Sequence, residues 1–188
     1  MTMTHSAKGF RFYTVGHGNR ELDDLRGQLA DQAIVVLVDI RSRPRSRHNP
    51  QFDEPALRAA CDESGITYHW AGRALGGLRR THPDSPHTAL PEGLRGFADH
   101  ADTPAVSRAI EQLEGLARDG PVVLLCAERD PMHCHRSLVA DRLLLSGHRV
   151  DHLVGIDASV THALRPEARK IGDRVIYDRG ATSPLPLH

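Results

Sequence analysis

Apolar runs alternate with amphipathic segments along most of the chain, a pattern typical of proteins built on a parallel β-sheet. Two runs, 34–40 and 122–125, are almost wholly apolar and predict strands buried on both faces. The same reading predicts three further strands, at 10–15, 66–70 and 149–154. Helices are expected between the strands, at 21–30, 54–64, 92–101, 104–118 and 131–145.

This order predicts a single-domain α/β fold, with an open, mainly parallel sheet and helices on both faces. We expect the domain to span residues 10–178, between a disordered terminus at 1–9 and a flexible tail at 179–188. The tail region after 157 is mixed, with one strand-like segment at 174–177. The segment 71–91 is rich in Gly, Pro and His, shows no period, and is expected to form a long loop or a mobile lid.

Composition narrows the class of partner only slightly. The 188 residues carry 24 basic and 24 acidic side chains, so net charge favours no partner. Aromatic residues make up 4% of the chain, which argues against a base-stacking platform for single strands. No apolar run reaches membrane-spanning length, and three cysteines without a signal peptide suggest reduced thiols. We therefore expect a cytoplasmic protein with no membrane partner; the oligomeric state stays open.

The segment 121–145 is the centre of the pattern. A buried strand ends at Cys126, and an Asp-Pro pair at 130–131 predicts the start of the following helix. Cys134, His135 and Arg136 then fall in the first helical turn. Free backbone N–H groups and the helix dipole favour anions at such a position.

Three loops are expected to share one edge of the sheet, because each follows a predicted parallel strand. They are 16–20, 39–48 and 126–136. Together they bring the candidate residues to one site: His17, Asn19, Asp39, Arg41, Arg43, Cys126, Glu128, Arg129, Cys134, His135 and Arg136.

These motifs also carry a resemblance. They are Thr14-Val-Gly-His-Gly-Asn19, Val38-Asp-Ile-Arg-Ser-Arg-Pro-Arg-Ser46, Tyr68 with Leu75-Gly-Gly77, Leu125-Cys-Ala-Glu-Arg-Asp-Pro131 and Cys134-His-Arg136. In combination, over residues 10–154, they resemble the bacterial and archaeal family catalogued as domain of unknown function 488. The resemblance implies a set of characteristic positions and no activity. Gly18 stands where the family commonly has Ser, so a hydroxyl is absent there.

The two central cysteines have several interpretations. Each is a nucleophile, a redox thiol, or a small residue that only packs. We expect Cys134 to be the more acidic, because of the helix start and the neighbouring His133, His135 and Arg136, and Cys126 to be desolvated and neutral. A Cys126–Cys134 redox pair is an alternative. The arginine loop of cysteine phosphatases does not match, because the sixth residue after Cys126 is Met132.

A metal site is the other alternative, because Cys126, His133, Cys134 and His135 are residue types that bind zinc. However, adjacent residues on a helix point in different directions and would not converge on one ion. The sequence reading therefore favours no metal and no other cofactor.

Four arginines, at 41, 43, 45 and 47, lie two residues apart and would share one face of an extended segment. Such a cluster repels itself unless an anion binds, so it suggests phosphate recognition. We expect Arg43, Arg129 and Arg136 to bind that anion together. His17 is either a general acid–base or a structural hydrogen-bond partner, and Asp39 and Glu128 orient arginines or act as a base.

The sequence reading thus assigns catalytic roles to His17, Cys126, Cys134 and Glu128. It assigns substrate binding to Asn19, Asp39, Arg41, Arg43, Arg129, His135 and Arg136. The expected function is an enzyme acting on a phosphate-bearing small molecule or nucleic-acid group. The alternative is a non-catalytic nucleic-acid-binding or regulatory module, in which arginines contact backbone phosphates and the cysteines pack. No reaction type follows from the sequence.

Overall fold

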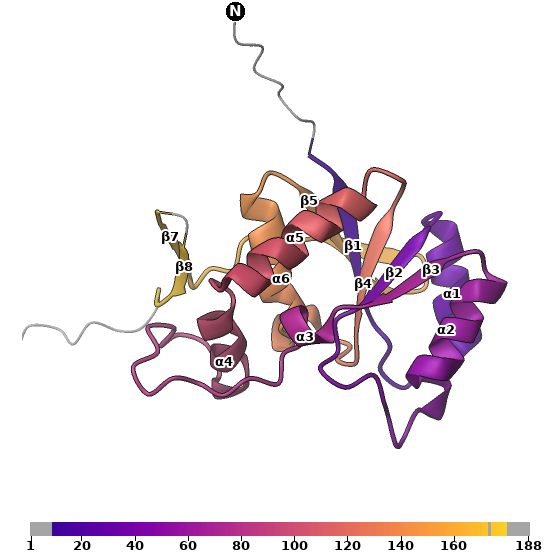
Figure 1. The fold of residues 1–188 in the computed structure, drawn as a ribbon, viewed down its shortest axis with the longest axis horizontal. Coiled ribbons are helices and arrows are strands. Elements are labelled where there is room, and N and C mark those ends of the chain that lie inside the picture. Colours follow the sequence, from indigo (N-terminus) through magenta and orange to yellow (C-terminus); the bar gives the residue numbers. More distant parts are fainter. Residues whose placement is uncertain (1–8, 173, 180–188) are drawn as a thin grey trace, which may run out of the picture.

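The protein's structure is a computed structural model that describes residues 9–172 and 174–179. Its centre is a six-stranded sheet in the order β3-β2-β4-β1-β5-β6 (Figure 1). The first five strands in the chain run parallel, as predicted, and only β6 pairs antiparallel to its neighbour. Their bounds are β1 Arg11–Gly16, β2 Val36–Asp39, β3 Thr67–Trp70, β4 Val122–Cys126, β5 Arg149–Gly155 and β6 Ala158–Thr161.

Helices connect the strands and cover both faces. They are α1 Leu22–Asp31, α2 Glu54–Glu63, α3 Gly72–Leu75, α4 Glu92–His100, α5 Pro104–Leu116 and α6 Arg136–Leu145, with short 3₁₀ turns at Pro50–Phe52 and Pro131–His133. Figure 1 shows α1 and α2 gathered on one side, while α5 and α6 lie on the other. The predicted α/β fold is therefore confirmed. No helix in the described ranges combines the length and apolarity needed to cross a membrane.

Alternation along β4 explains why the sheet needs two layers of helices. Val123 and Leu125 pack with residues of α1 and α2, whereas Val122 and Leu124 pack with residues of α4, α5 and α6. Successive side chains of a strand point to opposite faces, so an apolar strand has to be covered twice. Cys126 continues the second set, and its thiol therefore lies on the α6 side of the sheet.

Several predicted boundaries were wrong. The Asp-Pro pair starts only a 3₁₀ turn, in which the Asp130 side chain accepts a hydrogen bond from Met132 N, and α6 begins at Arg136. Two strands were missed in the mixed region after 157, β6 and β7 (Ala168–Ile171). The segment at 174–177 is a strand as expected, β8 (Arg174–Tyr177), which pairs with β7 in a separate hairpin.

The segment 71–91 is not free of structure. It begins with α3, and Leu75, His87 and Leu90 are buried in the protein. Its mobility stays a prediction. The expected disorder at 1–9 and 179–188 falls almost wholly outside the described residues.

A buried polar network attaches the region after β5 to the rest of the domain. The Asp141 carboxylate on α6 contacts the His162 ring at 2.9 Å and accepts hydrogen bonds from the Tyr177 hydroxyl at 2.9 Å and Arg165 N at 3.1 Å. His162 in turn contacts His152 at 2.9 Å. Burial lowers the pKa of His152 to about 3, and the neighbouring His162 adds to the shift. The network thus holds a neutral imidazole in the core.

We predict that Tyr177→Phe destabilises the protein by about 1–3 kcal/mol, because one buried oxygen of Asp141 loses its donor. Urea unfolding followed by circular dichroism measures the change. Tyr13→Phe is the matched control, since the Tyr13 hydroxyl makes no hydrogen bond within the described residues, and it should stay within about 0.5 kcal/mol. Equal effects of the two substitutions would contradict the prediction.

Candidate functional site

The three predicted loops do meet at one edge of the sheet. Backbone hydrogen bonds join the first to the third, from His17 N to Cys126 O and from Gly18 N to Ala127 O, both at 2.9 Å. Gly16 permits this approach, because a Cβ there would lie 1.8 Å from the carbonyl oxygen of Glu128. The second loop joins through Ile40 N, which donates to Leu125 O at 3.0 Å.

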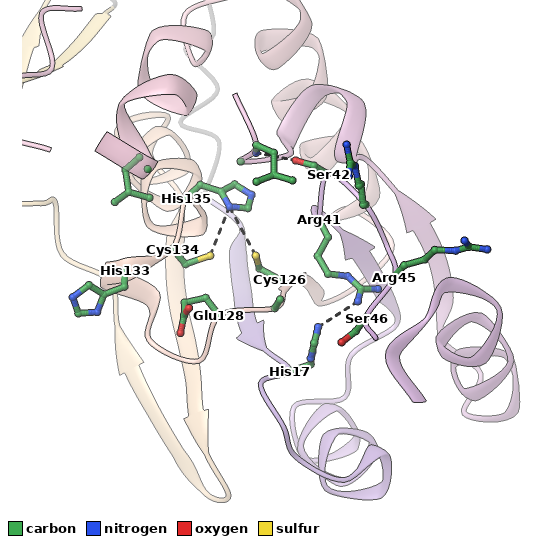
Figure 2. Close-up of a pocket in the computed structure, with 16 residues that line it drawn as sticks. His17, Arg41, Ser42, Arg45, Ser46, Cys126, Glu128, His133, Cys134 and His135 are labelled. Carbon is green, nitrogen blue, oxygen red and sulfur yellow. Dashed lines mark hydrogen bonds between the residues drawn. The ribbon is translucent and has the colours of Figure 1, made fainter. Parts of the chain in front are cut away.

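A cavity of about 480 Å³ opens between these loops (Figure 2). The segment after α3 contributes to its wall through Gly77 and Leu78, and the start of α4 contributes Gly93 and Leu94. Of the sequence candidates, those that line it are His17, Arg41, Arg43, Cys126, Glu128, Cys134 and His135. The structure thus places these side chains around one space, and the role assigned to each stays a prediction.

Arg41 is held in a buried ion pair. Its guanidinium donates to both carboxylate oxygens of Asp39, at 2.5–3.1 Å, and the two side chains are 5% and 0% exposed. The Tyr68 hydroxyl donates to the same carboxylate at 2.9 Å. Burial raises the pKa of the Tyr68 hydroxyl, and the Asp39 charge adds to this. Asp39 does not line the cavity, and its contacts with Arg41 match the orienting role that the sequence reading gave as one alternative.

His17 completes this unit. Its Nε2 lies 3.3 Å from an Arg41 guanidinium nitrogen and its Nδ1 lies 2.8 Å from Gly18 O, while its ring stacks on Phe52. Burial lowers the pKa of His17. A neutral ring that donates from Nδ1 and accepts from Arg41 at Nε2 satisfies both contacts. These contacts hold the His17 ring against Arg41, and its catalytic role stays a prediction.

Of the three arginines expected to bind one anion together, Arg43, Arg129 and Arg136, only Arg43 lines the cavity. Arg136 is buried, and its guanidinium donates to the backbone carbonyls of Glu128 and Arg129. It supports the cysteine loop from behind instead of facing the cavity. Arg129 is exposed outside the cavity wall, and its guanidinium lies 3.5 Å from the side-chain oxygen of Asn19. Neither Arg129 nor Asn19 lines the cavity.

Cys126, Cys134 and His135 form a compact cluster on the cavity wall. The Nδ1 atom of His135 lies 3.8 Å from the Cys126 sulfur and 3.7 Å from the Cys134 sulfur. Figure 2 shows the His135 ring facing both thiols, while His133 points away. All three residues are buried, with 3–8% of each exposed. The His133 side chain, by contrast, is 74% exposed and contacts Asp130.

The expected order of thiol acidity is reversed. A hydrogen bond from the Cys134 thiol holds the pKa of Cys126 well below the usual range. The same hydrogen bond to Cys126, with burial, raises the pKa of Cys134. The sequence reading placed Cys134 in the first turn of a helix. The backbone N–H and the charge of Arg136, at the start of α6, do lower the pKa of Cys134, but the hydrogen bond to Cys126 and burial outweigh them.

The sequence argument that Cys134 and His135 cannot converge on one metal ion fails, because α6 begins only after these two residues. Cys134 has an extended backbone (φ −119°, ψ 143°), whereas His135 is helical (φ −58°, ψ −17°). Their side chains can therefore reach one point. The ligand atoms of Cys126, Cys134 and His135 all lie within 4.8 Å of one another.

Sequence reasoning omitted four lining residues that matter for chemistry or shape: Ser42, Arg45, Ser46 and Leu78. Arg45 carried a signal, since it belongs to the arginine row. Ser42 carried none, although its hydroxyl accepts from Leu78 N at 2.9 Å and so attaches the wall segment to the arginine loop.

Fold and site together define a parallel α/β protein with a thiol–imidazole cluster and arginines at the carboxyl edge of its sheet. A family model described as "Domain of unknown function DUF488" matches residues 21–143, and the chain belongs to this family. Comparisons with curated proteins and with solved structures gave no match. The match to the family model confirms the resemblance that the motifs indicate.

We predict that Arg41→Gln destabilises the protein by about 3–5 kcal/mol, because the Asp39 charge would stay buried without its partner. Urea unfolding measures the change. The double variant Asp39→Asn/Arg41→Gln removes both charges and should recover part of the loss. A single variant within about 1 kcal/mol of wild type would show that the pair does not support this edge of the sheet.

Proposed function

We propose that the protein is an enzyme acting on a phosphate-bearing substrate, a nucleotide or a nucleic-acid group, bound in the cavity at the carboxyl edge of the sheet. The observation that supports this most strongly is the composition of the cavity wall. Two guanidinium groups that have no counter-ion among the described residues lie around the same space as the cluster of Cys126, Cys134 and His135. The guanidinium groups suit the binding of an anion, and the cluster offers groups that can react with a bound substrate.

The anion-binding part consists of Arg43 and Arg45. Both are exposed and line the cavity, and neither guanidinium has a hydrogen-bond or ion-pair partner in the described part of the chain. This contrasts with Arg41, whose hydrogen-bonding groups are engaged by Asp39 and His17. Guanidinium groups bind phosphate in bidentate fashion, and an unpaired pair of cations gains from such a ligand. The phosphate therefore belongs at Arg43 and Arg45.

The reactive part is the cluster, with Glu128 beside it. Glu128 is exposed and lines the cavity, and its carboxylate accepts a hydrogen bond from Arg129 N at 3.0 Å. It can act as a general base or acid toward a substrate in the cavity. The volume of about 480 Å³ falls in the range of small-molecule sites, which favours a nucleotide-sized ligand.

One observation favours the alternative, a non-catalytic nucleic-acid-binding module. Arg43, Arg45 and Arg47 are all exposed and alternate with less exposed residues, so they form a row along the outside of the loop. A row of this kind can follow successive backbone phosphates. Arg47 separates the two functions, because it belongs to the row and does not line the cavity.

We predict that Arg43→Ala and Arg45→Ala each weaken the binding of inorganic phosphate and of mononucleotides by about 10- to 100-fold. A hydrogen bond to a charged group contributes about 1.5–3 kcal/mol, which corresponds to that range. Calorimetric titration measures the affinities, and Arg47→Ala is the matched control, expected to bind like wild type. A screen of nucleotides and phosphodiesters should reveal turnover that Cys126→Ser loses while its phosphate affinity persists.

The module makes different predictions in the same experiments. Oligonucleotide binding would then fall steeply with salt, Arg47→Ala would weaken it as much as Arg43→Ala, and Cys126→Ser would change nothing. That set of results would overturn the proposed enzyme.

A further inference from the structure

We propose that Cys126, Cys134 and His135 are the three protein ligands of a zinc ion whose fourth coordination position opens into the cavity. This proposal goes beyond the enzyme proposed above and does not depend on the identity of its substrate. It rests on the placement of three ligand atoms, on the hydrogen bonding of the histidine, and on the space beside them.

The distances within the cluster match a tetrahedral site. With zinc–sulfur bonds of about 2.3 Å and a zinc–nitrogen bond of about 2.05 Å, the tetrahedral angle separates sulfur from nitrogen by about 3.6 Å. The observed separations are 3.8 Å from Cys126 and 3.7 Å from Cys134 to the same nitrogen, His135 Nδ1. Both sulfur–nitrogen separations therefore fit one ion, and the two sulfurs lie within 4.8 Å of each other.

Hydrogen bonding alone explains this arrangement less well. His135 Nε2 lies 3.2 Å from the carbonyl oxygen of Ile40, which can only accept, so the ring proton belongs on Nε2. Nδ1 then has one lone pair, which can accept from only one thiol, yet it lies almost equally far from both sulfurs. An ion between the three atoms uses that lone pair and both sulfurs together.

The contact with Ile40 is also the support that metal-binding histidines typically have. A ligating imidazole usually donates its other N–H to a carbonyl or carboxylate, which fixes the tautomer and the ring orientation. Here the acceptor is the backbone that follows β2, and the ring also packs against Phe97 at a centroid distance of 5.2 Å. Because Nδ1 carries no proton and the ring is held in one orientation, His135 is preorganised as a metal ligand.

The chain reaches this geometry because the two adjacent ligands differ in backbone conformation. Cys134 is extended and closes the 3₁₀ turn, whereas His135 is the cap residue before α6. Cys126 approaches from the end of β4. Thus two elements, the strand end and the start of the helix, supply ligands to one point, and the Arg136 hydrogen bonds to the loop between them hold that loop in place.

The ligand set identifies the metal and the kind of site. Two thiolates with one imidazole suit zinc, and three protein ligands with an open position are typical of catalytic zinc sites, whereas structural sites have four. All three ligands line the cavity together with Glu128. A zinc ion there would act as a Lewis acid toward an oxygen of a bound substrate, with Glu128 available to move a proton.

Metal titration of the full-length protein, stripped with a chelator and kept reduced with a phosphine, tests the proposal. We expect wild type to bind about one Zn²⁺ or Co²⁺ per chain. The Co²⁺ form should show thiolate-to-metal charge-transfer absorption and the intense visible bands of tetrahedral cobalt. Cys126→Ser, Cys134→Ser and His135→Asn should each weaken binding by more than about 100-fold, since loss of an outer-shell partner alone costs about 10- to 100-fold.

The chain provides matched controls. Cys61→Ser removes the third cysteine, which packs in the core between α2 and the opposite face of the sheet, and His133→Asn removes the exposed neighbouring histidine. Both should bind metal like wild type. Circular dichroism and a cooperative urea unfolding transition show that each ligand variant is folded. The proposal is overturned if reduced wild type binds Co²⁺ no more tightly than His135→Asn, if binding depends equally on Cys61 or His133, or if the cobalt spectrum lacks the thiolate band.

Discussion

The Arg41 guanidinium lies buried between the Asp39 carboxylate and the His17 ring, so it joins the loops after β1 and β2 through one set of hydrogen bonds. A buried charge without a partner is costly, and this pair therefore tolerates few other arrangements of the two loops. Tyr68 on β3 donates to the same carboxylate and extends the unit to the edge strand. The cavity takes its shape from this unit, because Trp70 donates to the carbonyl of Arg41 and the arginine loop leaves the sheet from there.

The arginines near the cavity consequently divide into two groups. Arg41 and Arg136 are buried, and their hydrogen bonds go to a carboxylate and to backbone carbonyls, so both serve the framework. Arg43 and Arg45 are exposed, without partners among the described residues, and available to a ligand. Arg165 belongs with the first group, since it donates to Met132 O in the cysteine loop at 2.8 Å. The region after β5 thus reaches across α6 to support the loop that contains the cluster.

Apolar patterning was sufficient to predict the parallel sheet, because strands such as β4 are buried on both faces and leave few alternatives. The meeting of three loops followed from that topology alone. The directions of individual side chains did not follow from the topology. Arg136 looked like an anion ligand because it follows a cysteine near a predicted helix start, yet its guanidinium is turned into the loop. The position of Cys134 was misjudged because an Asp-Pro pair predicts the start of a helical turn and does not distinguish a 3₁₀ turn from an α-helix. That boundary concealed the convergence of Cys134 with His135, while the thiol acidity was misjudged because the sequence does not show the hydrogen bond between the two thiols.

Charge balance links the two halves of the proposed site. Without a metal, a thiolate at Cys126 would attract the guanidinium groups of Arg43 and Arg45 and compete with a phosphate for them. A divalent cation held by both sulfurs and His135 would neutralise the charge of the thiolates. The sulfurs would then no longer compete with the phosphate for the arginines. The arginines then keep their positive charge for the substrate, while the open position of the metal faces the same cavity. In the proposed site, anion binding and metal binding would therefore support each other without sharing a single side chain.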